Sequence, residues 1–416
     1  MQTNLKWVLT LSLEKAMHFV IHTQYYPPEV GAPQSRLSEL AQGLVQRGYR
    51  VSVLTGMPNY PQGKIYPGYG GLLQRDQVQG IQVIRTALYP TNKISIISRL
   101  VSYFSFVFSS WLIGGFLLNE PDFILTESPP LFLGIAGYLL SRWKRARWIF
   151  NVSDLWPESA VRLGVLNAGW SLQLSYALEG FCYRKAWAVT GQSRSILESI
   201  RKRFPDVHTY HFSNGVDINQ FSPCKSTAQA EQLFNSNGRV TAIYAGLHGL
   251  AQGLDQVLYA SHLLRDLSEL QIVFVGDGPE KRKLEALARE LSLHNVLFLD
   301  PVPKTNVAAL LTASDICLVP LKTNIPGAVP SKLYEAMASE RPVILIAEGE
   351  ATEIVNNNHA GIVVKPGDIK GLAGAIHHLV DHPEVRNEFG HAGREAAVMY
   401  FNREDIVEDF VSFING

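Results

Sequence analysis

The sequence predicts an α/β fold made of two Rossmann-like, doubly wound domains that face each other across a cleft. Its 416 residues suit two domains of about 200 residues better than a single one. Hydrophobic residues make up 46% of the chain, which is enough for two packed cores. From Met17 onward, apolar strands alternate with helical patterns, and this alternation favours parallel strand pairing in doubly wound sheets.

The first predicted domain covers residues 17–212. It opens with the apolar strand HFVIHTQY, the Pro- and Gly-rich loop PPEVGAPQS and the helix RLSELAQGLVQRG. Further strands are expected at YRVSVLTG, IQVIRTA, DFILTES, WIFNVSD and AWAVTGQ, and the last helix at SILESIRKRF. Residues 1–16 contain a short apolar run broken by Ser12, Glu14 and Lys15, without a convincing signal-peptide cleavage site. We therefore interpret them as a dispensable extension.

The pattern restarts near Ser213, and the second predicted domain covers residues 213–390. Its strands are expected at RVTAIYAG, LQIVFVGDG, NVLFLDPV, DICLVPL and RPVILIA. The helices between them are GLDQVLYASHLLRD, EKRKLEALARELSL, NVAALLTAS and a helix that begins at Ser331. Because such sheets bind ligands at the carboxyl ends of their strands, the loops at those ends hold the candidate site.

Charge and cysteine content narrow the partners and the compartment. The 37 basic and 37 acidic residues balance, so no net field favours a nucleic-acid partner. Cys182, Cys224 and Cys317 are far apart and lack the spacing of a metal site or a disulfide framework. A reducing, cytosolic compartment is the resulting expectation.

Residues 100–118 carry no charge over nineteen positions, which is long enough for a membrane span. They lie between two strands of one predicted sheet, however, so a buried or membrane-facing helix is favoured over a span. Basic residues and tryptophans interleave shortly afterwards, which suits an anionic bilayer surface; they are Arg142, Trp143, Lys144, Arg145, Arg147 and Trp148. The alternative is a solvated helix end with ordinary basic residues.

Two motifs in the second domain predict binding of a nucleotide diphosphate. Gly276 and Gly278 follow the strand QIVFV, where glycines let an anion approach backbone amides, although a simple tight turn is the alternative. In PGAVPSKLYEAMA, Ser331 is the expected helix cap, and Lys332 with the first-turn amides faces the diphosphate. Glu335 shares the helix face of Lys332 and is expected to accept bonds from a ribose diol. An exposed Lys–Glu pair is the competing interpretation.

Four other residues are candidates by position. Asp154, at the end of WIFNVSD, is expected to orient an acceptor or donor-sugar hydroxyl, or else to act as a helix cap. Gly31 lies in the first strand-to-helix turn, where backbone approaches a ligand closely. Asn214 lies at the domain junction and suits a hinge that lines the cleft. Val302 follows LFLD and is expected to flank the base, unless that loop is an ordinary apolar turn.

Several segments together resemble a known family. YAGLHGLAQGLDQVLYA, VGDGPEKRKLE, FLDPVPKTNVAALLTASDICLVPL and PSKLYEAMASERPVI, in that order, resemble the donor-binding half of family-4 retaining glycosyltransferases. HTQYYPPEVGAPQSR, NVSDLWPESAV and FSNGVDINQF resemble the branch that builds bacterial exopolysaccharides, including colanic-acid-type enzymes, and surface glycans. This resemblance covers nearly the whole chain from Met17. It implies the GT-B architecture, with residues 391–416 forming a last helix that returns to the first domain.

The chain departs from the broader family at three positions. The second of the family's two glutamates, which are separated by seven intervening residues, matches Glu335, but Gly327 stands at the first. Leu247 and Gln252 lie about where many members carry an arginine and a lysine that clamp the diphosphate. Phosphate contacts are then expected from Lys332, from backbone amides and from Arg36 or His248. Gly246, which opens the GLHGLAQG loop, joins the predicted donor-binding residues.

The resemblance implies a retaining hexosyltransferase that uses a UDP-sugar, with UDP-glucose as first candidate, and needs no cofactor. The expected acceptor is a glycan or polyprenyl-linked saccharide, and the expected location is the cytoplasm, with peripheral contact at the inner face of the cytoplasmic membrane. No Asp-x-Asp pair is present, so metal independence is expected. A UDP-sugar 2-epimerase of the same fold and a non-catalytic nucleotide-sugar-binding protein are the alternatives. A dinucleotide-dependent dehydrogenase is disfavoured because no G-x-G-x-x-G follows the first strand.

Overall fold

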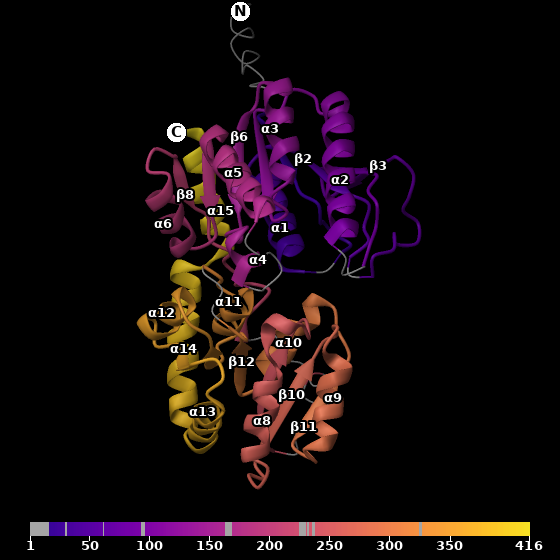
Figure 1. The fold of residues 1–416 in the computed structure, drawn as a ribbon. Helices are drawn as coiled ribbons and strands as arrows, with labels where there is room; N and C mark the ends of the chain where they lie inside the picture. Colours follow the sequence, from indigo (N-terminus) through magenta and orange to yellow (C-terminus); the bar gives the residue numbers. More distant parts are fainter. Residues whose placement is uncertain are drawn as a thin grey trace, which may run out of the picture. The chain divides into compact units, whose positions relative to one another are not determined.

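The computed structural model describes residues 16–29, 31–60, 62–92, 96–162, 169–223, 230, 233–234, 238–323 and 327–416. The predicted extension, apart from Ala16, and Cys224 lie outside these residues. The chain divides into two compact units. The first comprises Met1–Gly191 with Ile200–Tyr210, and the second comprises Gln192–Ser199 with His211–Gly416 (Figure 1).

The first unit is built on an eight-stranded sheet with the order β3-β4-β2-β1-β5-β6-β7-β8. Its strands are β1 (His18–His22), β2 (Arg50–Gly56), β3 (Leu73–Val78), β4 (Ile81–Thr86), β5 (Phe123–Ser128), β6 (Arg147–Val152), β7 (Ala188–Gly191) and β8 (Thr209–His211). The pairs from β4 through β7 are parallel, for example Phe19 with Val51 and Phe123. Because these strands are parallel, the carboxyl ends of β1, β2, β5, β6 and β7 lie at one edge of the sheet.

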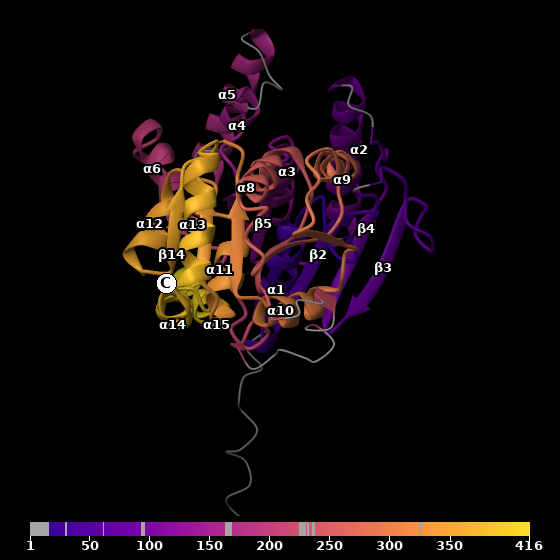
Figure 2. The same cartoon turned by 90° about the horizontal axis from the view of Figure 1, so that it is seen from below.

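Helices cover both faces of this sheet, as expected for a doubly wound fold. They are α1 (Ala32–Gln46), α2 (Ile96–Leu117), α3 (Leu133–Lys144), α4 (Glu158–Arg162), α5 (Trp170–Lys185) and α6 (Arg194–Arg203), the last of which spans both units. Figure 2 shows α1 on one face and α2, α3 and α5 on the other. Along the second face α2 packs on α3, and α3 packs on α5.

The strand β3 was not predicted from the sequence. It pairs with β4 as an antiparallel hairpin, with Leu73 opposite Thr86 and Val78 opposite Ile81. Gln79 and Gly80 connect the two strands and both have positive φ, at 51° and 80°, which is the geometry that two-residue hairpins favour. Most of the β3 side chains are exposed, so this edge strand lacks the apolar signal by which the others were recognised.

The apolar segment at residues 100–118 forms most of α2, which connects β4 to β5 within one sheet. Among the described residues, α2 is the one helix that is long and apolar enough to cross a membrane by length and composition. One third of that stretch is buried in the unit, where α2 contacts α3, β2 and β4. The helix therefore has one face in the core and one face outside it.

The second unit contains a six-stranded parallel sheet with the order β11-β10-β9-β12-β13-β14. The strands are β9 (Val240–Ala245), β10 (Leu270–Val275), β11 (Val296–Leu299), β12 (Ile316–Pro320), β13 (Val343–Ile346) and β14 (Gly361–Val364). All six run in the same direction, so their carboxyl ends and the loops that follow lie at one edge.

Side chains of these strands alternate between two cores. Ala242, Tyr244 and Phe274 enter one core with α8 (Asp255–Leu263), α9 (Lys281–Glu290) and α13 (Ile369–Asp381). Ile243 and Val275 enter the opposite core with α10 (Lys304–Ala313), α11 (Ser331–Ala338), α12 (Glu350–Asn357) and α14 (Pro383–Tyr400). The short helix η2 (Leu250–Gln252) precedes α8, and α15 (Arg403–Asn415) ends the chain in this unit. The predicted α/β class with two largely parallel sheets is confirmed.

Candidate functional site

Two glycine-containing loops pack backbone to backbone at the carboxyl edge of the second sheet. The His248 N–H donates to the Asp277 carbonyl at 2.9 Å, which ties the loop after β9 to the loop after β10. A methyl group added to Gly276 would overlap the Gly246 carbonyl, and one added to Gly278 would overlap the His248 backbone. Gly276 also has a φ of 139°, a conformation that favours glycine. The predicted glycines therefore allow the two loops to meet.

The helix α11 follows the loop after β12 and points its N-terminus toward the same edge. Ser331 is the first helical residue and not the cap, so the predicted capping role of Ser331 is wrong. Pro330 occupies the cap position with extended backbone (φ −63°, ψ 131°) and supplies no side-chain hydrogen bond. Among the described residues, no side chain therefore caps the first-turn amides that a serine cap would have used. They retain the partial positive charge that attracts an anion.

Lys332 passes directly over the loop after β9. Its Cε and Nζ occupy the space where a side chain on Gly246 would lie, so glycine at position 246 gives the lysine its path. The ammonium lies 5.9 Å from the centroid of the Tyr244 ring. Within the described part of the chain, no ion pair or hydrogen bond joins Lys332 to Glu335. The two side chains therefore do not form an ion pair in this structure, and their roles stay predictions.

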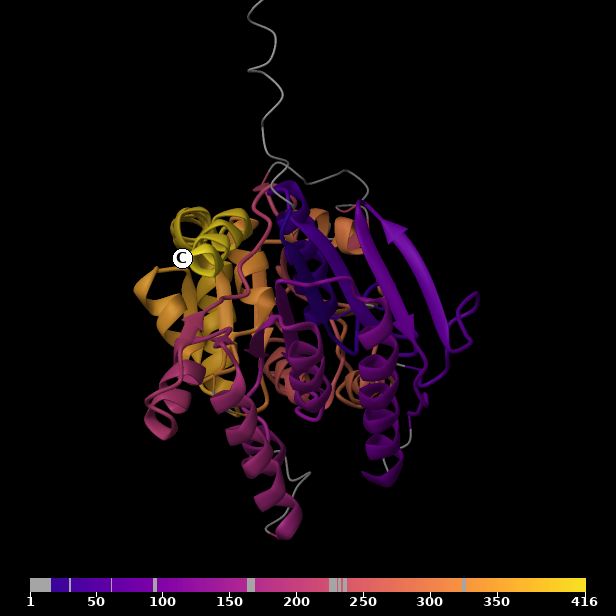
Figure 3. The ribbon, with the colours of Figure 1, turned by 90° about the horizontal axis from the view of Figure 1, so that it is seen from above.

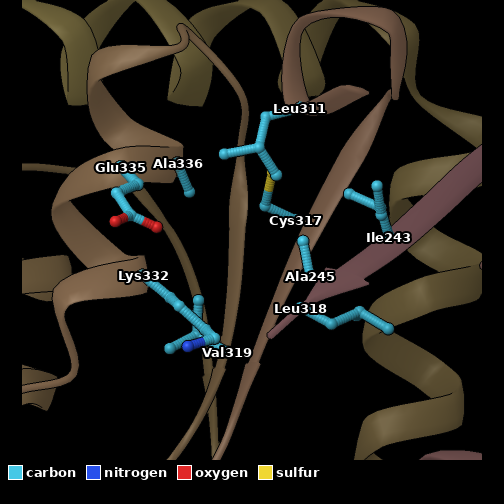
Figure 4. Close-up of a pocket in the computed structure, with 9 residues that line it drawn as sticks. All are labelled: Ile243, Ala245, Leu311, Cys317, Leu318, Val319, Lys332, Glu335 and Ala336. Carbon is cyan, nitrogen blue, oxygen red and sulfur yellow. The ribbon is translucent and has the colours of Figure 1, made fainter. Parts of the chain in front are cut away.

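Lys332 and Glu335 border a small cavity of about 10 Å³ between α11 and the strands. This volume is about that of one water-sized probe. Its other lining residues are mostly apolar: Ile243, Ala245, Leu311, Cys317, Leu318, Val319 and Ala336. In Figure 4, Lys332 reaches from α11 toward Val319, and Glu335 lies one turn further along the helix. Burial raises the pKa of the Cys317 thiol to about 12, so this cysteine stays protonated at neutral pH.

His248 lies in the core of the second unit. The imidazole is fully buried, with ring centroids 5.9 Å from Tyr244, 6.2 Å from Phe274 and 6.3 Å from Phe298. Among the described residues, neither ring nitrogen has a hydrogen-bond partner. Desolvation lowers the pKa of His248 to about 4, with a smaller contribution from Lys281. The imidazole is thus neutral at pH 7, and a phosphate contact would have to come from the loop backbone or from a rearranged loop.

Val302 and Asn214 lie at the rim of the second unit's core. Val302 follows β11 and packs its half-buried side chain against the core that contains α10 and α11. Asn214 is buried, and the next residue, Gly215, has its carbonyl bound by the Arg403 guanidinium at 2.6 Å. The segment around Asn214 is thereby fastened to the start of α15. Both donor-binding assignments stay predictions.

The positions at which the chain departs from the broader family have local explanations. Gly327 has a φ of 74°, and a side chain there would overlap Ile196 and Ser193. A glutamate does not fit at Gly327 without a change in the backbone. Leu247 is largely exposed, and Gln252 folds its side chain back toward Gly249.

In the first unit, the predicted phosphate ligand Arg36 belongs to a buried polar network that was not foreseen. Its guanidinium bonds to the Glu127 carboxylate and, at 2.6 Å, to the Ser153 hydroxyl. The Asn151 amide donates to Glu127 at 2.6 Å and accepts from the Thr190 hydroxyl at 2.6 Å. The network joins the carboxyl ends of β5, β6 and β7. Because Glu127 already neutralises Arg36, this arginine is poorly placed to attract a phosphate.

Asp154 begins the loop after β6 and has local partners. Its carboxylate accepts from the Ser159 hydroxyl and from the Leu155 N–H. Burial raises the pKa of Asp154, while these two hydrogen bonds oppose the increase. Its position is half-buried at the carboxyl edge, beside Trp156. Both the capping role and the substrate role stay compatible with this geometry.

A second feature at this edge, centred on Glu29, also escaped the sequence-based prediction. The Glu29 carboxylate accepts backbone N–H groups of Tyr26, Asn59 and Tyr60, at 3.3, 2.8 and 2.8 Å. It therefore holds the loop after β1 to the loop after β2. The predicted Gly31 follows this loop with extended backbone and immediately precedes α1. The glutamate within PPEVG gives no sequence signal for this role, because two of its three partners are backbone groups of a distant loop.

Comparisons with known families cover both halves of the chain. The family described as "Glycosyl transferase 4-like domain" matches residues 31–215, and "Glycosyl transferases group 1" matches residues 225–396. The putative colanic acid biosynthesis glycosyl transferase WcaI of Escherichia coli K12 is 26% identical over 96% of this chain and 100% of that protein.

Solved structures support the fold. Sucrose-phosphate synthase from Thermosynechococcus elongatus superposes with a TM-score of 0.76 at 19% identity, over 96% of this chain and 98% of that one. Anabaena HepE in complex with UDP and glucose gives 0.72 at 16% identity, over 96% and 99%. These likenesses, with the two parallel sheets, confirm the predicted GT-B fold.

Proposed function

Because the chain belongs to the group 1, family-4-like glycosyltransferases, we propose that it transfers a hexose from a UDP-sugar to a glycan or polyprenyl-linked saccharide. The proposed process is synthesis of an exopolysaccharide or envelope polysaccharide, in line with the similarity to WcaI, a putative colanic acid biosynthesis glycosyl transferase. UDP-glucose is the first candidate donor, since the structurally similar HepE was solved with UDP and glucose.

The position of the Lys332 ammonium is the observation that carries this proposal. It lies beside the N-terminus of α11 and the glycine loop after β9, and no carboxylate among the described residues neutralises it. As the sugar–phosphate bond breaks, negative charge grows on the β-phosphate and the sugar becomes oxocarbenium-like. A fixed cation and oriented amides stabilise that charge more than they stabilise the bound donor. Lys332 is therefore assigned the catalytic electrostatic role.

Two carboxylates complete the proposed assignment. Glu335 accepts hydrogen bonds from the ribose hydroxyls while Lys332 holds the diphosphate. Asp154 orients a hydroxyl of the acceptor or of the donor sugar. Retention of the anomeric configuration is proposed to follow from attack on the face from which the phosphate departs, with that phosphate receiving the acceptor's proton. This avoids the two closely spaced carboxylates that retaining hydrolases use.

Metal independence is also part of the proposal. A compact ammonium at the diphosphate can take the place that a divalent cation holds in other transferases. Activity with the best donor should persist in excess EDTA at the level measured without chelator. A loss of activity in EDTA that Mg²⁺ or Mn²⁺ restores would contradict the proposed role of Lys332 as the principal phosphate cation.

Incubation with a panel of UDP-sugars tests the function directly. UDP release that increases when a saccharide acceptor is added supports the transferase, and the donor with the highest rate identifies the sugar. Conversion of one UDP-sugar into another without UDP release would instead identify a 2-epimerase. Binding without any turnover of the panel would identify a nucleotide-sugar-binding protein.

The proposed location is the cytoplasm, with peripheral contact at the inner face of the membrane. Cys182 and Cys317 are free and buried in the structure, as a reducing compartment allows. The cytoplasmic side also holds the nucleotide sugars that such an enzyme uses. Fractionation of cells into soluble, peripheral and integral membrane proteins tests this location.

A further inference from the structure

The outward face of α2 carries an unbroken row of large apolar side chains. We call this row the α2 stripe; it consists of Val101, Phe104, Phe108, Leu112 and Phe116. The spacing of three and four residues places all five on one side of the helix. Phe108 and Phe116 are 61% and 71% exposed. A contiguous apolar surface of this kind marks an interaction site more often than scattered single residues do.

The serines of α2 do not lie where an ordinary surface helix carries its polar residues, although the inward face also holds the apolar Phe106 and Val107. These serines face inward: Ser102 and Ser110 are buried, and the Ser110 hydroxyl bonds to the His22 ring at 3.0 Å. Ser109, next to it, donates to the Ala87 carbonyl at 2.5 Å. A helix at a protein–water boundary normally turns its polar residues outward and its apolar residues inward. The outward face of α2 therefore matches an apolar environment better than it matches water.

The neighbouring helix α3 extends this apolar surface. Leu139 and Trp143 are exposed and lie one turn apart on α3. The Trp143 ring occupies the space beside Gly115 of α2, and its edge meets Phe116 with centroids 5.3 Å apart. Figure 3 shows α2 (violet) and α5 (magenta) extending from the same side of the sheet. On α5, Trp170 and Leu174 are also exposed.

All charged residues on α2 and α3 are basic, and the exposed acidic residues Glu120 and Asp122 come only after the end of α2. Arg99 is exposed near the first turn of α2, and the end of α3 carries three basic residues: Arg142, Lys144 and Arg145. An apolar face with tryptophan and flanking basic residues is complementary to a bilayer whose headgroups are anionic. A second protein copy would bring the same positive charges to the contact.

We infer that the α2 stripe, with Leu139 and Trp143 of α3, docks this protein onto an anionic lipid bilayer. The helix lies along the interface and does not cross it, because β4 and β5 at its two ends belong to one sheet. Apolar side chains enter the headgroup region, and Arg99, Arg142 and Arg145 contact lipid phosphates.

The stripe also leads toward the predicted substrate loops of the first unit. Phe104 contacts Phe132 with ring centroids 5.0 Å apart, and Phe132 contacts Trp156 at 5.8 Å. Trp156 follows Asp154 in the loop after β6. Docking would thus bring this loop to the membrane surface, where the saccharide of a lipid-linked acceptor is found. This last step rests on the proposed function and location, whereas the choice of the α2 stripe as the docking surface rests on the exposed side chains and charges alone.

Flotation of the full-length protein with lipid vesicles tests the inference without any sugar substrate. The vesicles contain phosphatidylcholine alone or phosphatidylcholine with phosphatidylglycerol. We expect the protein to float with the anionic vesicles and more weakly with the neutral ones. The double variant Phe108→Ser/Phe116→Ser should reduce binding by about tenfold or more. Arg142→Gln/Arg145→Gln should reduce it by about fivefold per charge on anionic vesicles alone.

A matched control separates this surface from general hydrophobicity. Leu72 and Leu263 are 78% and 53% exposed and belong to neither α2 nor α3, so Leu72→Ser/Leu263→Ser should bind like the parent. Hydrogen exchange of the unmodified protein adds a readout that needs no variant: anionic vesicles should slow exchange in α2. Equal binding of the stripe variant and the control, equal binding to both vesicle types, or unchanged exchange in α2 would overturn the inference. So would light scattering that shows a dimer for the parent and a monomer for the stripe variant.

Discussion

At the scale of single residues, substitution of Lys332 distinguishes the proposed catalytic role from a purely structural role of this side chain. Lys332→Ala should lower kcat by about 10²–10³-fold, because one well-placed donor to the developing charge is worth about 3–4 kcal/mol. The donor KM should rise less, since the ground-state diphosphate carries less of the charge that the lysine stabilises. Lys332→Arg should restore activity only in part, because its planar guanidinium cannot occupy the narrow path over Gly246. Steady-state kinetics with the best donor measures both constants, and a kcat within threefold of the parent would favour the structural interpretation.

Glu335 is tested by binding and not by turnover. Glu335→Ala leaves the ribose hydroxyls of UDP without a charged acceptor, and hydrogen bonds to charged groups are worth about 1.5–3 kcal/mol. UDP affinity measured by calorimetry should therefore fall about ten- to a hundredfold. Glu335 has a half-buried side chain at the cavity, so the fold should persist, with thermal melting as the control. An unchanged affinity in the folded variant would remove Glu335 from the site.

The sequence could predict residues whose role depends on a local motif, but not those whose role depends on a distant partner. Lys332 and Glu335 were proposed because PSKLYEA predicts a helix start and a common face within a few residues, and the structure has a helix there. Arg36 looks equally available in the sequence, yet Glu127, 91 positions later, neutralises it. His248 likewise stands in a glycine-rich loop, and only tertiary packing places its ring among Tyr244, Phe274 and Phe298.

At the scale of structural elements, the two loops after β9 and β10 should respond differently to the same change. A methyl group at Gly276 meets the backbone of Gly246, which cannot move without disturbing the sheet edge. Gly276→Ala should therefore destabilise the second unit, by the cost of its positive φ of about 1–3 kcal/mol plus that of the overlap. A methyl group at Gly246, whose φ of 154° also favours glycine, meets side-chain atoms and not backbone: the flexible end of Lys332 and, at 3.3 Å, the Tyr244 hydroxyl.

Gly246→Ala should consequently cost less stability but more activity. It displaces the ammonium from its path, so kcat should fall toward the value of Lys332→Ala while the melting temperature changes less than for Gly276→Ala. Lys332→Ala/Gly246→Ala should then lose little more activity than Lys332→Ala alone, because both changes remove the same interaction. Independent, multiplying losses in kcat would contradict the proposed dependence of Lys332 on this glycine.

The elements themselves were predicted well where burial imposes a pattern. The strands of both parallel sheets are continuous apolar runs because helices cover both faces. The exposed hairpin strand β3 has no such pattern and was missed. The α2 segment shows the limit of sequence-based prediction in another way. Its composition alone is compatible with a membrane span, a core helix and an interfacial helix. The inward serines, which distinguish these cases, become visible only when the sheet is in place.

At the scale of the whole molecule, each unit contains a buried histidine whose pKa is lowered by desolvation. In the first unit, burial lowers the pKa of His22 to about 3, and its Nε2 is paired with Ser110. In the second unit, burial lowers the pKa of His248 to about 4. Both values lie below the ordinary 6.5, so the unfolded chain binds protons in a range where the folded units do not. Each unit is therefore expected to lose stability in mild acid, because its histidine binds a proton more readily in the unfolded chain.

The resulting pH dependence can be assigned to one unit by substitution. Stability from a neutral buried histidine is complete above pH 6.5 and falls as the pH drops toward the folded pKa. At pH 5, each histidine should cost its unit about 2 kcal/mol relative to pH 7. His248→Leu keeps an apolar side chain among the aromatic rings but removes the proton-binding site. Between pH 7 and 5, the melting temperature of the second unit should then fall about 4–8 °C less in the variant than in the parent.

The first unit keeps His22 in both proteins and serves as the internal control. Its melting temperature should fall by the same amount between pH 7 and 5 in the parent and in the variant. Scanning calorimetry resolves the two transitions where the units unfold separately. Equal shifts of the second unit's transition in parent and variant would show that His248 is already protonated, or hydrogen-bonded, in the folded protein.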